Sequence, residues 1–406
     1  MIAPATPRPH LRALAYSACA TAAILCLGAI LGARQIQHHV YALAPLTFSL
    51  KNQGVALQQS AFEKPDLLPL YGSSELIKPI PNKAATFFRR YPTGFEVFPV
   101  GKAGTSSLVI LQKLAGVGKD VRGRKVAISL SPSWFFTSQI PPHYYEGNFS
   151  KLQADEFAFC SDLSWGLKRD VARRMLDFPS TLARHPLLAF ALRRLAGGSR
   201  TDHLLFALAW PFGRIETAIL RAQDEFETTA FIWQQGRLKN PHRLPHALDW
   251  ETFLLHAAQK VNPGRLRAEE VGGDWQLPES KGDAEFLMNL QLAREWVDFE
   301  LLLRSLRESG AEPLVLSMPL NGAWLDRVGI SRGARSQYLA RLRALTERYH
   351  VPLQDFQEHE ADPRFLADHH DHLSIEGWMY YNRALDDFYH DRIPSRATSL
   401  PLRFDR

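Results

Sequence analysis

The segment DLLPLYGSSELIKP, residues 66–79, decides how the chain is expected to fold. It starts with an apolar run, meets a glycine at position 72, and then shows two serines where a buried strand usually passes into a helix. Ser73 and Ser74 would lie beside free backbone N–H groups at that turn, which suits an alkoxide or an oxyanion. A serine in this position is also typical of a helix N-cap, so the segment alone leaves both interpretations open.

Four further segments share the apolar character of residues 67–72 and are predicted to be strands. They are FEVFPVG (95–101), KVAISLSP (125–132), PLVLSMP (313–319) and VPLQDF (351–356). Because these runs are apolar on both sides, we expect a parallel sheet that is buried on both faces.

Helical patterns alternate with the predicted strands. One long helix is expected to carry a single apolar face made of Phe286, Leu290, Ala293 and Val297, and a later helix a face made of Leu339, Leu342 and Leu345. A last amphipathic helix follows Ser374 and ends near His390. This alternation predicts an α/β domain with three layers.

Two stretches interrupt that alternation. Residues 150–280 are rich in Leu, Ala, Arg and aromatic residues and are predicted to form a helical insertion between the third and fourth strands. Its aromatic residues, such as Trp210 and Trp233, are interpreted as core or partner-facing packing residues and not as a cofactor site. Residues 35–65 are expected to be a polar connector with short apolar patches.

The N-terminal region contains a candidate membrane anchor. Residues 13–33 read ALAYSACATAAILCLGAILGA, 21 residues without a charge, which is the length of a helix that crosses a bilayer. Arg8 and Arg12 before it and Arg34 after it favour a cytoplasmic N-terminus only weakly. A cleaved signal peptide is the alternative, but its apolar core would have only about 7–15 residues. We therefore predict a tail and anchor over residues 1–34 and an extracytoplasmic domain over residues 35–406.

The overall composition is that of a globular protein, with 46% hydrophobic and 22% charged residues. The net charge of +6 is too small to indicate a nucleic-acid partner. A surface that meets anionic lipids or phosphate-rich polymers would carry such an excess, and so would a basic surface with no partner.

The segment FLADHHDHLSIEGW, residues 365–378, is the second candidate for chemistry. It contains a cluster of acidic and imidazole side chains: Asp368, His369, His370, Asp371 and His372. Neighbouring side chains diverge and no helical HExxH spacing is present, so we expect no metal site. The segment follows the last predicted strand and leads into the last helix. This places it at the sheet edge that also presents Ser73 and Ser74.

Together the two segments offer a nucleophile, an orienting carboxylate and a base in the chain order Ser, Asp, His. A serine hydroxyl needs an imidazole to remove its proton, and the imidazole needs an acceptor on its other nitrogen. His372 is the predicted base because DHLSIEGW runs directly from it into the helix, and His369 is the fallback.

Four motifs in this order resemble the DltD family of membrane-anchored, SGNH-hydrolase-like proteins of the D-alanylation pathway. They are GSSEL (72–76), VGKAGTSSL (100–108), SPSWF (131–135) and HLSIEGW (372–378), and GNFSKLQ (147–153) and MPLNGAW (318–324) are also similar to that family. The resemblance covers nearly the whole chain and implies an SGNH/flavodoxin-like fold.

The resemblance also implies roles for individual residues. GSSEL aligns the nucleophile with Ser74, so that Ser73 holds the turn. The VGKAG segment makes the N–H of Gly104 an oxyanion donor, and HLS makes His372 the base.

This sequence departs from the family pattern in two places. The SGNH pattern has Asp three residues before His, whereas here Asp368 lies four residues before His372 and Asp371 is adjacent to it. We favour Asp368 as the orienting group, because the adjacent side chain would have to double back. The Asn of the third block is replaced by SPSWF, so the oxyanion hole must rely on backbone donors, with Ser131 or Trp134 shaping the pocket.

The resemblance implies an enzyme that transfers D-alanyl groups to an envelope polymer, a teichoic-acid-like chain or another glycan or lipid, without a metal or other cofactor. The implied partners are a D-alanyl donor, held by a carrier or an acyltransferase, the polymer acceptor, a multi-span membrane acyltransferase and the membrane. Three alternatives remain open: a D-alanyl thioesterase or esterase, a non-catalytic scaffold for the acyltransferase and carrier, and an O-acetylating enzyme for polysaccharide.

Overall fold

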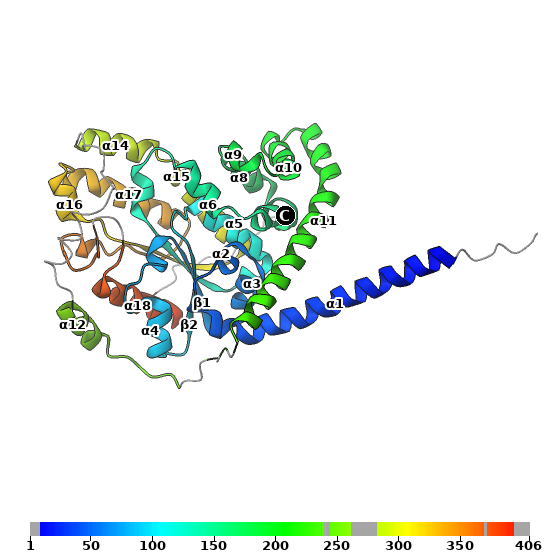
Figure 1. Ribbon diagram of the computed structural model, residues 1–406. Coiled ribbons are helices and arrows are strands. Elements are labelled where there is room, and N and C mark those ends of the chain that lie inside the picture. The colour runs from blue at the N-terminus through cyan, green and yellow to red at the C-terminus, as the bar shows by residue number, and fades with distance from the viewer. Residues whose placement is uncertain are drawn as a thin grey trace, which may run out of the picture.

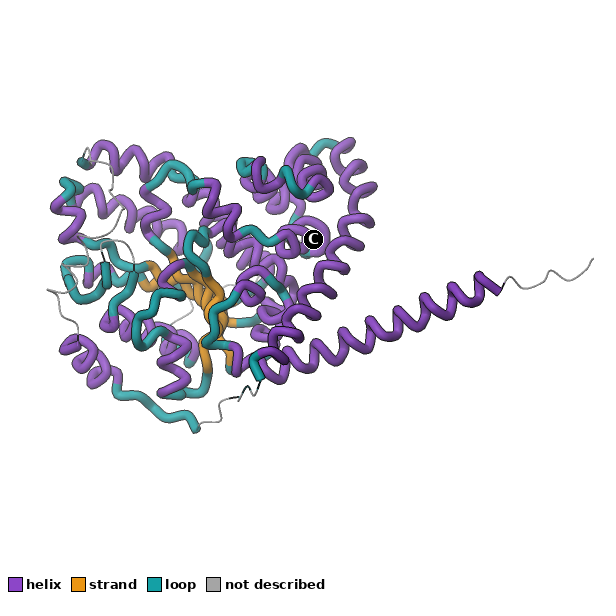
Figure 2. Tube along the Cα trace, in the orientation of Figure 1, coloured by secondary structure: helices purple, strands orange, loops and turns teal. Residues whose placement is uncertain are grey.

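The computed structural model of the chain describes residues 9–236, 238, 240, 244–260, 282–368 and 372–393 (Figure 1). A sheet runs through the centre of the body, and helices surround it (Figure 2). The predicted α/β class with a parallel sheet is confirmed.

The sheet has five parallel strands in the order β2-β1-β3-β4-β5. Their bounds are β1 Leu67–Gly72, β2 Glu96–Gly101, β3 Lys125–Leu130, β4 Glu312–Ser317 and β5 Leu353–Gln354. All five lie within or overlap the predicted segments. The last strand is shorter than predicted because only Leu353 and Gln354 pair with β4, and Phe356 adopts a left-handed conformation with φ of 50°.

Side chains of successive strand residues enter two separate cores, as the alternation of a pleated strand requires. In β1, Leu67 and Tyr71 pack into one core, and Leu68 and Leu70 pack into the other. Helices α3 (Ala56–Glu63), α5 (Ser107–Val117), α15 (Glu295–Ser309) and α17 (Arg332–Arg348) contribute to the first core. Helices α4 (Ala84–Arg90), α12 (Trp250–Lys260) and α18 (Ile375–Tyr389) contribute to the second. The predicted three layers are therefore present.

The prediction of one long helix over residues 286–297 is wrong. The chain forms α14 (Asp283–Leu292) and then α15, and Ala293 between them has an extended backbone with ψ of 120°. Phe286, Leu290 and Ala293 are buried as predicted, but Val297 is exposed. The predicted apolar face of α17 and the last helix, α18, which Ser374 caps, are confirmed.

A series of helices connects β3 to β4. They are α6 (Pro142–Asn148), α7 (Lys151–Asp155), a π-helical turn (Glu156–Cys160), α8 (Trp165–Met175), α9 (Pro179–Leu182), α10 (Pro186–Gly197) and α11 (Arg200–Gln234), followed by α12, α14 and α15. On α11, Trp233 is largely exposed, whereas Trp210 is about half exposed and its Nε1 donates to the carbonyl oxygen of Phe159 at 3.0 Å. The remaining elements are α16 (Gly322–Arg327), α2 (Ser49–Gln53) and the 3₁₀ turns η1 (Ser74–Leu76), η2 (Gly118–Val121), η3 (Pro132–Phe136) and η5 (Gln357–His359).

The N-terminal helix α1 (Pro9–Leu43) projects from the body for most of its length (Figure 1). Its last turns enter the first core through Ile36, Val40 and Leu43, and α2 and α3 follow directly. The prediction of a polar connector over residues 35–65 is therefore wrong. Within the described part of the chain, no helix is found whose length and apolar character would let it cross a membrane.

Candidate active site

Ser74 begins the 3₁₀ turn η1 directly after β1, at the carboxyl edge of the sheet. The backbone N–H of Ser73 donates to both carboxylate oxygens of Glu75, at 2.9 and 3.0 Å. A side chain at position 72 would collide with that carboxylate and displace it from the N–H of Ser73. Gly72 and Glu75 thus shape the turn at the end of the strand, after which the half-buried Ser74 faces His372.

Ser73 has a different place from its neighbour. It is buried, its hydroxyl lies 3.5 Å from the carbonyl oxygen of Lys102, and it makes no side-chain cap for the turn. Ser73 stands at the N-cap position of η1, but its side chain forms no capping hydrogen bond and contacts the residue that follows β2.

Asp368 and His372 lie shortly before α18 in the chain. The backbone N–H of Ala367 donates to the carbonyl oxygen of His372 at 2.7 Å, and Leu366 pairs with Leu373 in an antiparallel bridge. This register places position 367 opposite position 372, and the carboxylate of the next residue, Asp368, reaches the ring of His372. His369 and Asp371, the fallback base and the alternative carboxylate, lie outside the described residues.

The structure brings Ser74, His372 and Asp368 into one hydrogen-bonded chain, although 298 positions separate the serine from the histidine. Ser74 Oγ lies 2.8 Å from His372 Nε2, and His372 Nδ1 lies 2.7 Å from Asp368 Oδ2. The side chains of His372 and Asp368 are only 12% and 18% exposed. This arrangement can remove a proton from a serine hydroxyl and return it to a leaving group.

Lys78, which the sequence analysis did not single out, forms an ion pair with the same oxygen of Asp368 that faces His372. Burial would raise the pKa of the Asp368 carboxyl, but the hydrogen bonds and charges of His372 and Lys78 outweigh it and hold that pKa well below its usual range. Asp368 is therefore ionised wherever the protein is folded near neutral pH.

Gly104 lies three residues after β2, in the loop beside the serine turn. Its φ of 82° is left-handed, and a side chain there would collide with the ring of Tyr144. Asn148 fixes this loop, because its amide group donates to the carbonyl oxygens of Ala103 and Tyr144 and accepts from Thr105 Oγ1, at 3.0, 2.9 and 3.0 Å. Neither Tyr144 nor Asn148 was singled out from the sequence, although Asn148 belongs to the GNFSKLQ segment.

The residues of the SPSWF segment follow β3, which is the other neighbour of β1. Ser131 Oγ and Ser133 Oγ lie 2.8 Å apart, and the ring of Trp134 meets that of Tyr144 edge to face with centroids 5.3 Å apart. Trp134 therefore reaches the Gly104 loop through Tyr144. In a sheet of this strand order, ligands bind outside the carboxyl ends of the strands where the order reverses, which here is between β1 and β3.

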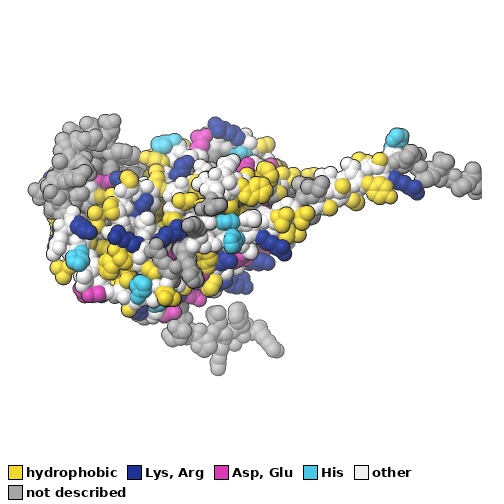
Figure 3. All heavy atoms as spheres, turned by 60° about the horizontal axis from the view of Figure 1, so that its bottom comes forward, with side chains coloured by type: hydrophobic (Ala, Val, Ile, Leu, Met, Phe, Trp, Pro, Cys, Tyr) yellow, Lys and Arg dark blue, Asp and Glu magenta, His cyan; other side chains and the backbone are white. Residues whose placement is uncertain are grey.

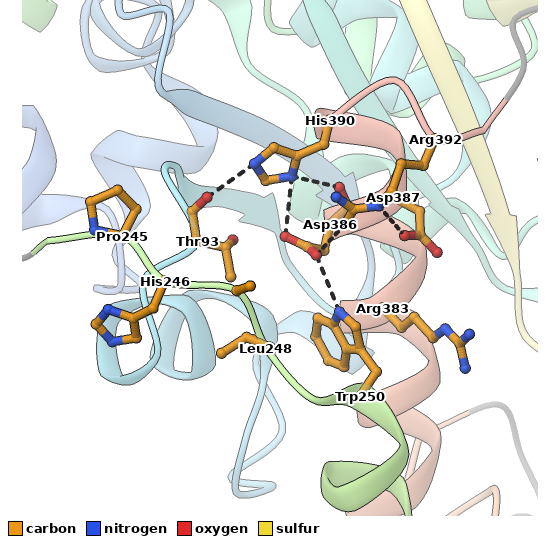
Figure 4. Close-up of a pocket in the computed structure, with 11 residues that line it drawn as sticks. Thr93, Pro245, His246, Leu248, Trp250, Arg383, Asp386, Asp387, His390 and Arg392 are labelled. Carbon is orange, nitrogen blue, oxygen red and sulfur yellow. Dashed lines mark hydrogen bonds and ion pairs between the residues drawn. The ribbon is translucent and has the colours of Figure 1, made fainter.

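The described residues contain no group of three His, Cys, Asp or Glu side chains that could hold a metal ion. A cavity of about 520 Å³ lies instead at the amino end of the strands, beside Thr93, Trp250 and His390 (Figure 4). Its polar groups bind one another: His390 Nε2 lies 3.0 Å from the carbonyl oxygen of Thr93, and Trp250 Nε1 donates to Asp386 at 3.2 Å. This cavity is separate from the serine site.

Comparisons with known proteins identify the family of the chain. Protein DltD of Bacillus subtilis (strain 168) is 26% identical over 367 residues, which cover 88% of this chain and 90% of that protein. Protein DltD of Staphylococcus aureus (strain NCTC 8325 / PS 47) is 24% identical over 82% of this chain and 83% of its own length, and that of Lacticaseibacillus rhamnosus is 23% identical over 79% and 77%. A family model described as DltD protein matches residues 47–390, and the chain therefore belongs to the DltD family.

Proposed function

We propose that this chain is a serine acyltransferase that acts in the D-alanylation of a cell-envelope polymer. The observation that carries the proposal is the contact of 2.8 Å between Ser74 Oγ and His372 Nε2, with Asp368 on the other ring nitrogen. Membership of the DltD family supports the choice of D-alanyl as the acyl group. The residues themselves support acyl transfer by serine.

In the proposed reaction, His372 Nε2 takes the proton of Ser74 Oγ as this oxygen attacks the carbonyl carbon of an activated D-alanyl donor. The tetrahedral intermediate collapses, the donor leaves with the proton from His372, and a D-alanyl ester on Ser74 remains. A hydroxyl of the polymer then loses its proton to His372 and attacks that ester. The polymer keeps the D-alanyl group, and Ser74 Oγ recovers its proton.

The negative oxygen of each intermediate requires hydrogen-bond donors. We assign the backbone N–H groups of Ser74 and Gly104 to this role, since no hydrogen bond of either group occurs within the described residues. Trp134 and Tyr144 would form the apolar wall on the side of Gly104.

The proposal includes attachment to the membrane through α1, with the body on the outer face of the cell membrane. It is supported by the charge-free segment 13–33 and by the exposure of large apolar side chains along this helix, such as Leu14, Leu27 and Ile30. A multi-span membrane acyltransferase or a carrier would supply the D-alanyl donor there.

The direct test is a comparison of Ser74→Ala with Ser73→Ala in cells that lack the native protein. We expect Ser74→Ala to lose the D-alanyl ester of the envelope and Ser73→Ala to keep most of it, because the hydroxyl of Ser73 makes only a contact of 3.5 Å. Full D-alanylation with Ser74→Ala at a normal protein level would refute the catalytic role and favour a scaffold. Release of free D-alanine without an acceptor would favour a hydrolase.

A further inference from the structure

Helix α11 exposes its apolar side to the surroundings. Seven large apolar side chains on it are between 60% and 73% exposed: Leu204, Leu208, Phe212, Ile215, Ile219, Phe226 and Trp233. They are spaced by three, four or seven residues, so they lie within a band about 80° wide and about 44 Å long on the helix surface. We call these seven residues the α11 stripe. Asp, Glu, Lys and Arg are absent from this band of the helix.

The opposite side of α11 faces the body. Near its two ends this side buries Phe206 and Ile232 in the first core, and between them it carries small and polar residues: Gly213, Thr217, Asp224 and Thr228. The ring of Phe159 packs directly on Gly213, where a side chain would collide with it. Asp224 Oδ2 accepts from the backbone N–H groups of Val55 and Ala56 at 2.7 and 2.8 Å and so caps α3. These contacts fix the rotation of the helix, so the apolar side cannot turn inward.

This arrangement departs from the usual pattern of a surface helix, which buries its apolar stripe, because seven large apolar side chains of α11 are exposed. Packing against the body does not explain the α11 stripe, because the body meets the other side. An exposed apolar surface of this length indicates contact with a membrane or a partner.

The position of α1 favours a membrane. Gly32 of α1 packs against α11, where an added side chain would lie 2.9 Å from Thr229 Oγ1. Beyond this contact, α1 exposes Leu27, Ile30 and Leu31. It leaves the body on the side that α11 forms (Figure 1), and apolar side chains continue along it (Figure 3). An anchor in α1 would therefore hold the α11 stripe close to the bilayer surface.

We propose that the α11 stripe lies in the lipid interface of the bilayer that anchors α1. This inference rests on the proposed anchor. A helix with one apolar side that carries Phe, Leu, Ile and Trp enters the boundary between headgroups and acyl chains without crossing the bilayer. The stripe would fix the orientation of the body on the membrane, which a single anchor helix cannot do. The carboxyl edge with Ser74 would then keep one direction relative to the outer leaflet.

The test uses the full chain with its three cysteines replaced by serine and one new cysteine that carries an environment-sensitive fluorophore. Ile215→Cys reports on the stripe. Leu292→Cys on α14 is the matched control, because it is 56% exposed, compared with 60% for Ile215, and lies on the other side of the body (Figure 1). Each protein is reconstituted into vesicles of phosphatidylcholine and phosphatidylglycerol, with or without lipids brominated on their acyl chains.

We expect a blue shift and a loss of emission with brominated lipids at position 215, and no change at position 292. If the fluorophore at position 215 shows the emission typical of water while the chain floats with the vesicles, the proposed lipid contact of the α11 stripe is overturned. The proposed anchor is then unaffected. A chain that does not float would overturn both. A blue shift without quenching by the brominated lipids, together with crosslinked dimers, would show that a second copy of this chain, and not lipid, covers the α11 stripe. A further variant combines Ile215→Glu with Ile219→Glu and carries the fluorophore at Phe226→Cys. It should fold normally but lose the quenching by brominated lipids.

Discussion

His372 uses both ring nitrogens in the site, and this decides its tautomer. Its Nδ1 faces the ionised Asp368 at 2.7 Å, so the neutral ring carries its proton there and leaves the lone pair of Nε2 for the proton of Ser74. Asp368→Asn would offer a neutral amide in place of the carboxylate and favour the wrong tautomer. We expect a loss of acyl transfer of about 10⁴-fold with unchanged folding, measured as the rate of D-alanyl transfer by the purified chain. A loss of less than about tenfold would show that Asp368 does not orient the ring.

Lys78 is a positioning residue, because it binds the carboxylate and not the reacting atoms. Lys78→Met should raise the pKa of Asp368 toward its usual value and slow acyl transfer by about fivefold at most. The effect is small because the lysine is 38% exposed, and an ion pair at such a site contributes ~1 kcal/mol. Lys78→Arg keeps the charge and should restore the rate. Equal rates for the two variants would show that the charge at this position has no role.

The sequence predicted Ser74, His372 and Asp368 because a strand end, a helix start and a family resemblance marked them. No such signal marks Lys78. Its carboxylate partner is 290 positions away, and a lysine after a turn is unremarkable by itself. Asn148 is missed for a similar reason, since its role depends on how α6 approaches the Gly104 loop.

At the scale of elements, the loop after β2 depends on a glycine. Gly104→Ala must accept both a φ of 82° and a collision with the ring of Tyr144, whereas Gly118→Ala meets the strain of a φ of 72° without any neighbour within 4 Å. We expect both variants to lose about 1–3 kcal/mol of stability from strain. Only Gly104→Ala should also slow acyl transfer, because it moves the proposed oxyanion donor. Thermal unfolding and transfer rates measured together distinguish the two, and an unchanged rate for Gly104→Ala would remove this donor from the mechanism.

The first residue of α15, Glu295, is a buried acid at the start of α5 that should make stability depend on pH. Glu295 Oε1 accepts the N–H of Ser107 at 2.8 Å, and burial raises the pKa of this carboxyl from 4.5 to about 8. The charge of nearby Asp298 raises this pKa further, and Arg174, which pairs with both oxygens of Asp298, lowers it only in part. The folded chain thus holds a proton that the unfolded chain releases, and this contribution to stability is lost as the pH rises from about 4.5 through 8.

Glu295→Gln should therefore flatten the decrease of the unfolding free energy between pH 5 and 8, while Glu300→Gln on the exposed side of α15 should not. Urea unfolding at several pH values measures this difference. A Glu295→Gln profile parallel to that of the unchanged chain would contradict the raised pKa.

The strands were predictable because each is a short apolar run between turn residues. The break between α14 and α15 was not, because the apolar spacing continues across it. Phe286, Leu290 and Ala293 are all buried, but the N–H of Arg294 donates to the carbonyl oxygen of Ser138 at 3.3 Å, a contact from outside the helix. Such a tertiary contact leaves no trace in the local pattern.

At the scale of the whole molecule, the sheet brings together residues from both ends of the chain. Because all five strands are parallel, the turns after β1, β2 and β3 and the loop before α18 can meet at one edge. Parallel topology made this meeting predictable. The orientation of the connecting helices was not predictable. The spacing of residues can reveal an apolar stripe such as that of α11, but it does not indicate whether this stripe faces the body or the surroundings.

The most direct test of the account is the reaction of the purified full chain with a fluorophosphonate, followed by mapping of the adduct by mass spectrometry. The account predicts one adduct on Ser74, none in Ser74→Ala, and a strongly reduced rate in His372→Ala, with Ser138→Ala unchanged as a control. A folded chain that forms no adduct, or one whose adduct persists in Ser74→Ala, would contradict it.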